Sequence, residues 1–170
     1  MDLKEVFRFI SPEVKTAAIE AAGKLDQLGI RYAIAGGLAV GAHGYIRATI
    51  DVDFLVGDEA FEHQGSLVTF KAGVPIEVNS VRIDYLSPKA LGPQMEDVLN
   101  NPTRSQGLPV LPIEVLVFTK LTAKRRRDLV DVIELVKAGA DVRRIREYLK
   151  RYADDLLPVF EELLEEALAE

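Results

Sequence analysis

The chain has 170 residues, 48% of them hydrophobic and 28% charged, which is the composition of a globular domain large enough to bury a core. The absence of cysteine excludes disulfides, thiol nucleophiles and thiolate metal sites, and two histidines are too few for a histidine-rich metal centre. Because no apolar run approaches a membrane span and the first residues lack a secretory pattern, we expect a cytoplasmic protein that does not contact a membrane.

Two helices are predicted at the start of the chain. Apolar residues fall on one helical face over residues 3–10, and Ser11 and Pro12 then supply an N-cap and a proline at the first helical position. The second helix is expected to stop at Gly29. We expect this pair to pack behind a sheet and to carry no chemistry.

The first predicted strand, residues 31–35, is followed directly by Gly36 and Gly37, which open a short apolar helix reaching Gly44. A strand, a glycine turn and a helix N-terminus together form a place where backbone N–H groups can cradle a phosphate. Taken alone, the turn is more often purely structural. His43, near the end of this helix, is predicted to be a packing or capping residue.

The next predicted strand, residues 50–56, contains Asp51 and Asp53, although aspartate is depleted in strand interiors. Alternation along a strand places both on one face, about 6.5–7 Å apart. Like charges this close favour a bound cation, and Mg²⁺ takes oxygen ligands while leaving room for substrate phosphates. An isolated Asp-x-Asp is more often a solvated strand end.

The glycine pair 36–37 and the aspartates occur together, with Arg47 and Thr49 just before Asp51. This combination resembles the nucleotidyltransferase superfamily with the DNA-polymerase-beta-like fold. The form Gly-Gly-Leu-Ala…Arg-x-Thr-x-Asp-Val-Asp is most similar to a small prokaryotic branch that includes AbiEii-type toxins and minimal nucleotidyltransferases. Many superfamily members place a serine after the glycines, whereas Leu38 stands here, so one side-chain phosphate contact is missing.

The resemblance implies that the glycine turn holds the triphosphate of a nucleoside triphosphate and that Asp51 and Asp53 hold Mg²⁺ or Mn²⁺. It also implies that Arg47 adds positive charge near the phosphates, and that Thr49 supplies a hydroxyl hydrogen bond or strand packing. A third carboxylate from a neighbouring strand completes the metal cluster in this family, and Asp84 is the best match.

Asp84 lies in the apolar strand predicted over residues 81–86, which Asn79 and Ser80 join to a strand over residues 75–78. It would act as a metal ligand or as the base that takes the proton of the attacking hydroxyl. The alternative is a partner for Arg82, and Glu77 is the fallback carboxylate. Residues 58–65 are expected to form a loop or a single helical turn, and residues 67–70 another strand.

Residues 94–100 predict a short helix, residues 101–107 a polar loop and residues 108–111 an edge strand. We therefore expect an α+β fold with a small mixed sheet of four to five strands and helices packed on it. Residues 1–111 would form the core with its N-terminal helices, and residues 112–170 a helical segment packed on it as one domain.

A helix is predicted from Pro112 to about Ala123, and it leads into a basic run. The spacing of Lys120, Ala123, Arg125, Asp128 and Asp131 resembles a later motif of the same toxin-like branch. Lys120 and Lys124 lie one helical turn apart, so we expect both to face the triphosphate. Asp128 is placed in the nucleotide-binding set, and N-capping the following helix is its favoured role.

The net charge of −6 is unevenly distributed, because the basic residues gather between 119 and 151 and the last 17 residues contain acids and no base. This favours an anion-facing surface near Lys120, with solvated helix faces as the alternative. The wide apolar face of the last helix would close the core, form a homodimer or bind a partner. Scarce Cys and Met with abundant Glu and Arg are typical of thermophiles.

The predicted function is Mg²⁺-dependent transfer of a nucleoside monophosphate from a nucleoside triphosphate to a hydroxyl acceptor on RNA such as tRNA, on a protein or on a small molecule. The alternatives are a non-catalytic nucleotide-binding module and a toxin–antitoxin component that acts through a protein partner. The acceptor, the base preference and the oligomeric state stay open.

Overall fold

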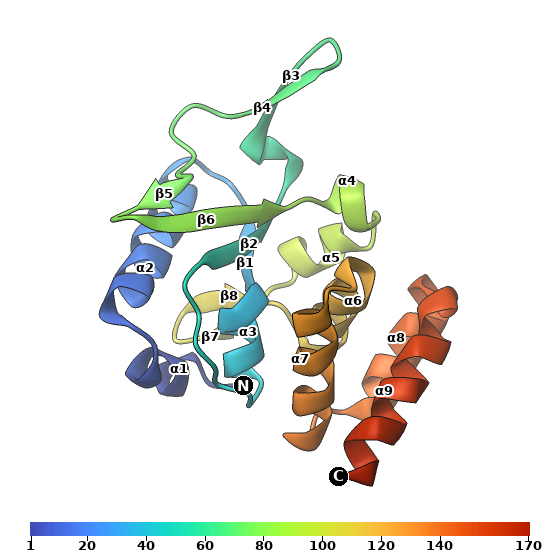
Figure 1. Cartoon of the computed structure of the whole chain (residues 1–170). Coiled ribbons are helices and arrows are strands. Elements are labelled where there is room, and N and C mark those ends of the chain that lie inside the picture. Colours follow the sequence, from blue (N-terminus) through green and yellow to red (C-terminus); the bar gives the residue numbers. More distant parts are fainter.

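A six-stranded mixed sheet, with strand order β5-β6-β2-β1-β8-β7, organises the computed structural model, which describes residues 1–170 (Figure 1). The strands of this sheet are β1 (Tyr32–Ala35), β2 (Val52–Val56), β5 (Glu77–Val78), β6 (Val81–Leu86), β7 (Thr103–Ser105) and β8 (Leu108–Val110). Strands β3 (Phe61–Gln64) and β4 (Leu67–Phe70) form a separate hairpin. The helices are α1 (Leu3–Phe9), α2 (Pro12–Gln27), α3 (Gly36–Ala42), α4 (Pro88–Leu91), α5 (Met95–Asn100), α6 (Ile113–Ala123), α7 (Arg126–Lys137), α8 (Val142–Tyr152) and α9 (Leu157–Ala169).

The predicted α+β class and the mixed sheet are confirmed, but the sheet has one strand more than the upper expectation. The residues predicted as a polar loop contribute β7, which pairs with β8 in a hairpin turned by Gln106 and Gly107, both at positive φ. The predicted strand 67–70 forms, but it pairs with residues 61–64 and not with the main sheet. That hairpin projects beyond the sheet (Figure 1).

Strand register brings the glycine turn and the aspartates together. Strand β1 pairs antiparallel with β2, which places Ala35 opposite Asp53, and β2 pairs parallel with β6, which places Asp53 opposite Asp84. Side chains opposite each other on neighbouring strands share a face. Helix α3 starts at Gly36, immediately after Ala35, so the turn lies directly beside both carboxylates.

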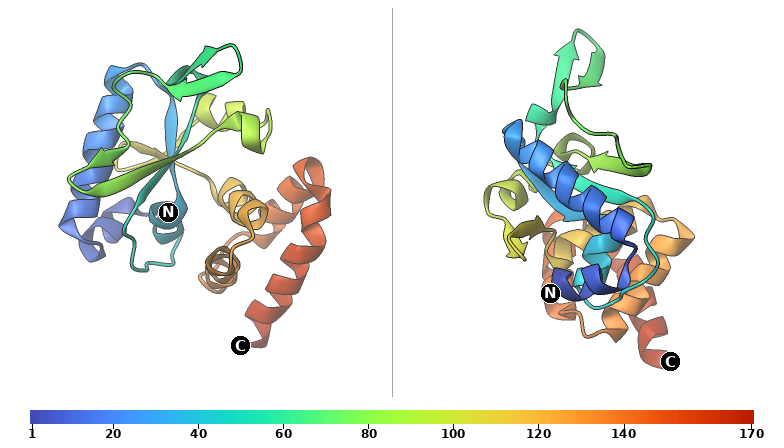
Figure 2. Two further views of the ribbon diagram at one scale, coloured as in Figure 1. Left: turned by 45° about the horizontal axis from the view of Figure 1, so that its top comes forward. Right: turned by 90° about the vertical axis from the view of Figure 1, so that its left-hand side faces the viewer.

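The helices fall into two groups on either side of the sheet's central strands (Figure 2). Helix α2 packs on β2, β5 and β6, while α6 contacts α3, α7 and α8, and α9 packs on α7. Ser11 caps α2 as predicted, and His43 caps the end of α3, where its Nε2 donates a hydrogen bond to the Leu111 carbonyl at 2.7 Å. One cluster of 48 buried residues runs through both groups, from Leu3 to Ala167.

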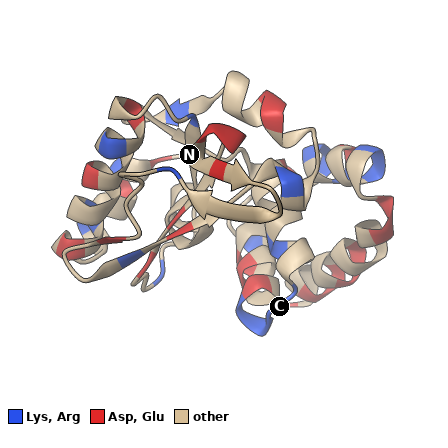
Figure 3. Cartoon of the chain, turned by 90° about the horizontal axis from the view of Figure 1, so that it is seen from above, with Lys and Arg blue, Asp and Glu red and all other residues tan.

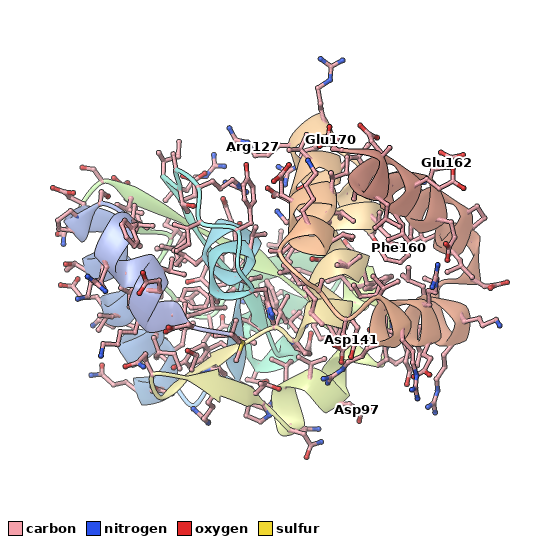
Figure 4. The ribbon with its side chains drawn as sticks, turned by 90° about the horizontal axis from the view of Figure 1, so that it is seen from below. Asp97, Arg127, Asp141, Phe160, Glu162 and Glu170 are labelled. Atoms are coloured by element: carbon pink, nitrogen blue, oxygen red, sulfur yellow. The ribbon has the colours of Figure 1, made fainter.

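The last helix is packed within this core. Phe160 is fully buried and points into the helical group (Figure 4), and Leu163, Leu164 and Ala167 are buried beside it. The acidic residues of α9 lie along the outside of the helix (Figure 3). Leu168 is 76% exposed. None of the helices combines the length and the apolar character needed to cross a bilayer.

Candidate active site

Gly36 is required by the packing of the turn against β2. Its φ of +58° lies in the left-handed region that favours glycine, and a Cβ placed on it would lie 2.1 Å from a carboxylate oxygen of Asp53. Gly37 is equally crowded, because a Cβ there would lie 2.7 Å from the Thr49 hydroxyl oxygen and 3.2 Å from a guanidinium nitrogen of Arg47. The glycine pair therefore lets the backbone approach the strand that carries the predicted site residues.

Asp53 is the carboxylate without a partner. It is half-buried, and its side chain forms no hydrogen bond or ion pair. Burial, followed by the nearby charge of Asp84, raises the pKa of Asp53 to about 6, against the opposing charges of Lys120 and Arg125. Asp53 is therefore ionised at neutral pH in a place that disfavours a lone negative charge, which is an environment that favours a cation.

Asp51 and Asp84 are instead joined by Arg82, a residue that the sequence predicted only as a possible partner of Asp84. The Arg82 guanidinium lies 3.2 Å from the Asp84 carboxylate and 3.8 Å from that of Asp51. Its side chain is 69% exposed, so the two contacts contribute little stability and are easily exchanged. Arg82 follows the alternation of β6 and shares a face with Asp84.

Lys120 lies in a buried ion network across the cavity from β2. Its Nζ contacts Asp131 at 2.8 Å and Asp128 at 3.2 Å, and both aspartates are buried. Asp131 also accepts two hydrogen bonds from Arg47, at 2.7 and 2.8 Å, in a bidentate pair. Burial opposes the ionisation of Asp131, but the hydrogen bonds from Arg47 and Lys120 outweigh it and hold its pKa below the ordinary value.

Asp128 is not the N-cap of the following helix, as predicted, but lies three residues after the N-cap. Arg125 is the N-cap of α7, and Asp128 is the third residue of the helix, where its carboxylate accepts from the Arg125 backbone N–H at 3.2 Å. The carboxylate still satisfies a free donor of the helix start, as a residue at this position can. It also contacts the Arg125 guanidinium at 2.8 Å and so holds that side chain at the cavity.

Two further residues that were considered for the site, Lys124 and Glu77, lie outside the cavity. Lys124 does not line the cavity, because α6 ends there with Lys124 at φ +55°, which takes its side chain off the helical face of Lys120. Glu77 does not line it either, whereas Asp84 does. The structure thus brings Asp84, and not the fallback residue, beside Asp53.

The cavity that unites these residues has a volume of about 340 Å³. With the exception of Lys124, its lining contains the residues predicted for metal and nucleotide binding, namely Gly36, Gly37, Arg47, Thr49, Asp51, Asp53, Asp84, Lys120 and Asp128. It also contains Arg82, predicted only as a partner of Asp84, and Arg125, predicted only as part of the motif around Lys120, together with Arg127, for which no role was predicted. Arg127 is the second residue of α7 and forms no ion pair (Figure 4). A run of basic residues before a helix is the signal that identifies Arg125 and Arg127.

The donor set of the cavity suits a hard divalent cation, although no group of three or more His, Cys, Asp or Glu side chains is arranged around one point. Mg²⁺ is usually held by one or two carboxylates with substrate phosphates and water as the other ligands, so a complete protein cage is not needed. Asp53, with its unpartnered carboxylate and raised pKa, has the charge and chemistry of such a ligand. Asp51 and Asp84 would have to exchange Arg82 for the ion.

Comparison with models of protein families gave no match, and comparison with curated proteins gave none either. Among solved structures, the chain is similar to an antigenic nucleotidyltransferase-like protein from Paracoccidioides brasiliensis. The two chains share 20% sequence identity over 91% of this chain and 93% of that one, with a TM-score of 0.47. At this identity and TM-score, the likeness does not indicate a family or an activity for this chain.

Proposed function

We propose that the protein transfers a nucleoside monophosphate from a nucleoside triphosphate to a hydroxyl acceptor. The observation that carries this proposal is the sharing of one cavity by the glycine turn, the unpartnered Asp53 and the guanidinium groups of Arg47, Arg125 and Arg127. A triphosphate needs backbone donors and cations, and its transfer needs carboxylates that can hold a divalent ion.

Each side of the cavity has its own part in this reaction. The Gly36–Gly37 turn would place backbone amides against the triphosphate, and Arg125 and Arg127 would neutralise it from the start of α7. Arg47 is fixed by its bidentate contact with Asp131, so its position is set before substrate arrives. The ammonium group of Lys120 is already paired with two aspartates, so its part would be to hold this wall of the cavity and the helix start beside the triphosphate.

Asp53 and Asp51, with Asp84 beside them, are the residues that would hold Mg²⁺ or Mn²⁺. When bound, such an ion neutralises the charge that develops on the phosphates and orients the attacking hydroxyl. Asp84 lies at the outer side of this group, on β6, where it can accept the proton of the acceptor hydroxyl.

Calorimetric titration of each of the four nucleoside triphosphates, with and without Mg²⁺, tests the proposal. We expect Mg²⁺-dependent binding to the wild-type protein and its loss in the double variant Asp51→Asn, Asp53→Asn. The matched control is Asp97→Asn, Asp155→Asn, which changes the net charge equally at two exposed aspartates without ion pairs outside the cavity. Unchanged Mg²⁺-dependent binding in the site variant would contradict the assignment.

Release of pyrophosphate separates the catalytic proposal from its closest alternative. Saturable binding without pyrophosphate release in the presence of any hydroxyl acceptor would identify a nucleotide-binding module. The contacts of Arg82 with Asp51 and Asp84 favour the nucleotide-binding module, because Arg82 competes with a metal ion for these two carboxylates. Substituting Arg82→Ala should therefore raise the apparent affinity for Mg²⁺ if the carboxylates are ligands.

A further inference from the structure

The outer edge of β6 is left open next to the candidate active site. Strand β5 is only two residues long and pairs with Val81 and Arg82, whereas β6 continues to Leu86. The last contact on this edge is the hydrogen bond from the Ile83 N–H to the Ile76 carbonyl, at 3.0 Å. Because hydrogen-bonding direction alternates along a strand, Tyr85 directs its N–H and C=O outward in the same way, beyond the end of β5.

A groove of about 660 Å³ runs along this edge. Phe70, Ile76 and Tyr85 give it an apolar lining, with Phe70 41% exposed and Ile76 61% exposed. The hydroxyl of Tyr85 donates to the Pro75 carbonyl, which ties the segment after β4 to the strand. Arg82 and Asp84 line both this groove and the candidate active site, so the two are continuous.

We propose that the groove binds the acceptor, and that the acceptor is a polypeptide segment which adds to the edge of β6 as an extended strand. This inference rests on the proposed nucleotidyl transfer and names its acceptor class. An exposed strand edge supplies main-chain hydrogen bonds, and flanking apolar recesses supply specificity, in many complexes of this kind. Both features are present here within one groove.

Strand alternation predicts which residues of the segment matter. The residue opposite Asp84 shares its face, and Asp53 lies on that same face one strand further in. Its two neighbours point to the other face, where the ring of Tyr85 packs against Phe70 with centroids 5.3 Å apart. The recognised pattern is therefore a Ser, Thr or Tyr between two apolar residues.

The transfer step balances without a further reactant. The hydroxyl oxygen of the segment forms a bond to the α-phosphorus, and the bond from that phosphorus to the oxygen bridging to the β-phosphate breaks. Pyrophosphate leaves with the electron pair. The hydroxyl proton passes to the Asp84 carboxylate and then to water, and the product is a phosphodiester between the side chain and the nucleoside.

The charges along the groove favour a peptide over a nucleic acid. Its single cation, Arg82, already contacts two aspartates, and Glu77 and Asp84 would repel a phosphate backbone. Arg127, a cation without an ion pair, lies instead in the first turn of α7 and lines the candidate active site on the nucleotide side. Strand β6 therefore presents an apolar, nearly neutral surface to the acceptor.

The test uses the full chain with Mg²⁺ and each of the four α-³²P-labelled nucleoside triphosphates. The probes are a synthetic peptide array with a central Ser between Ile, Val or Phe residues, the same array with Gly or Lys as neighbours, and total RNA. We expect label on the apolar-flanked peptides, and loss of most of it when the peptide amide facing Tyr85 is N-methylated. Nucleotide binding is measured in parallel by calorimetry.

The protein variant is Phe70→Ser with Ile76→Ser, and its control is Phe9→Ser with Ile19→Ser, two comparably exposed positions outside the groove. We expect the groove variant to raise the peptide KM at least tenfold with unchanged nucleotide affinity, and the control to leave both unchanged. Three results would overturn the inference while nucleotide binding persists. They are label on RNA only, peptide labelling that the groove variant does not change, and a dimer that the groove variant converts to monomers. Loss of nucleotide binding itself would identify failure of the proposed function.

Discussion

The candidate active site contains two pairs of aspartates with opposite electrostatics. Asp51 and Asp53 lie on β2, and the pKa of Asp53 is raised to about 6 because its charge is half-buried and unpartnered. Asp128 and Asp131 lie on α7, are buried, and contact Lys120, Arg47 and Arg125. The same residue type therefore serves two purposes around one site: the helical pair is matched by buried cations of the chain, whereas Asp53 of the strand pair has no partner and keeps its charge available for a ligand.

This difference separates stability from function. Removing a partner from a buried ion network leaves an uncompensated charge, which is strongly unfavourable. Removing an unmatched charge relieves repulsion and stabilises the folded protein. A site that holds such a charge for a ligand therefore lowers stability as long as the ligand is absent. The three predictions that follow test this contrast, in order of decreasing effect.

The largest effect is expected for Asp131→Asn. The substitution leaves the buried ammonium of Lys120 and the guanidinium of Arg47 short of one negative charge, so the free energy of unfolding should fall by about 3–5 kcal/mol. Urea denaturation measures the change. The control is Glu134→Gln, on the same helix at a part-exposed pair with Lys137, where the loss should be below about 1 kcal/mol. If both variants lost the same free energy of unfolding, the buried ion network would contribute no more to stability than an exposed ion pair.

Asp53→Asn should raise the free energy of unfolding at neutral pH, which is the opposite of the effect of Asp131→Asn. Since the folded-state pKa of about 6 lies above the ordinary 3.8, ionisation opposes folding, and this unfavourable contribution grows as the pH rises through that interval. The variant should be more stable than the wild type by about 2–3 kcal/mol at pH 7 and equally stable below about pH 4. Thermal unfolding between pH 4 and 7 follows the difference.

Adding Mg²⁺ sharpens this second prediction. An ion that binds the folded wild type should raise its melting temperature at pH 7 and leave that of the Asp53→Asn variant nearly unchanged. Lower stability of the variant at pH 7, together with no effect of Mg²⁺ on the wild type, would show that the strand pair is structural like the helical pair.

Arg125→Ala should have the smallest effect on stability. The side chain is 78% exposed and Asp128 retains its contact with Lys120, so we expect a loss of no more than about 1 kcal/mol. Nucleotide affinity should nevertheless fall by about three- to tenfold, because Arg125 lines the cavity. Arg143→Ala, at an exposed helical pair with Glu147, is the control, and calorimetry should show unchanged affinity there.

Several features of the site were predictable because they depend on residues close together in the chain. Strand alternation fixes the common face of Asp51 and Asp53, and a glycine pair after an apolar strand predicts a turn that side chains would block. The placement of Asp84 came from a family resemblance and its position in an apolar strand, and the register of β6 on β2 agrees with it. The sheet has one strand more than predicted because residues 103–105, in the predicted polar loop, pair with β8 across the Gln106–Gly107 turn.

The sequence by itself determined the local chemistry: the glycine turn, the paired carboxylates, the basic run and the apolar periods that form the core. Only the tertiary structure decided how the charges are matched. It joined Arg47 to Asp131 across 84 positions of the chain, placed Arg82 between Asp51 and Asp84, and left the outer edge of β6 unpaired beyond the end of β5. Local patterns follow from alternation and steric limits within a few residues, whereas charge matching and open edges depend on which distant segments meet when the core is buried.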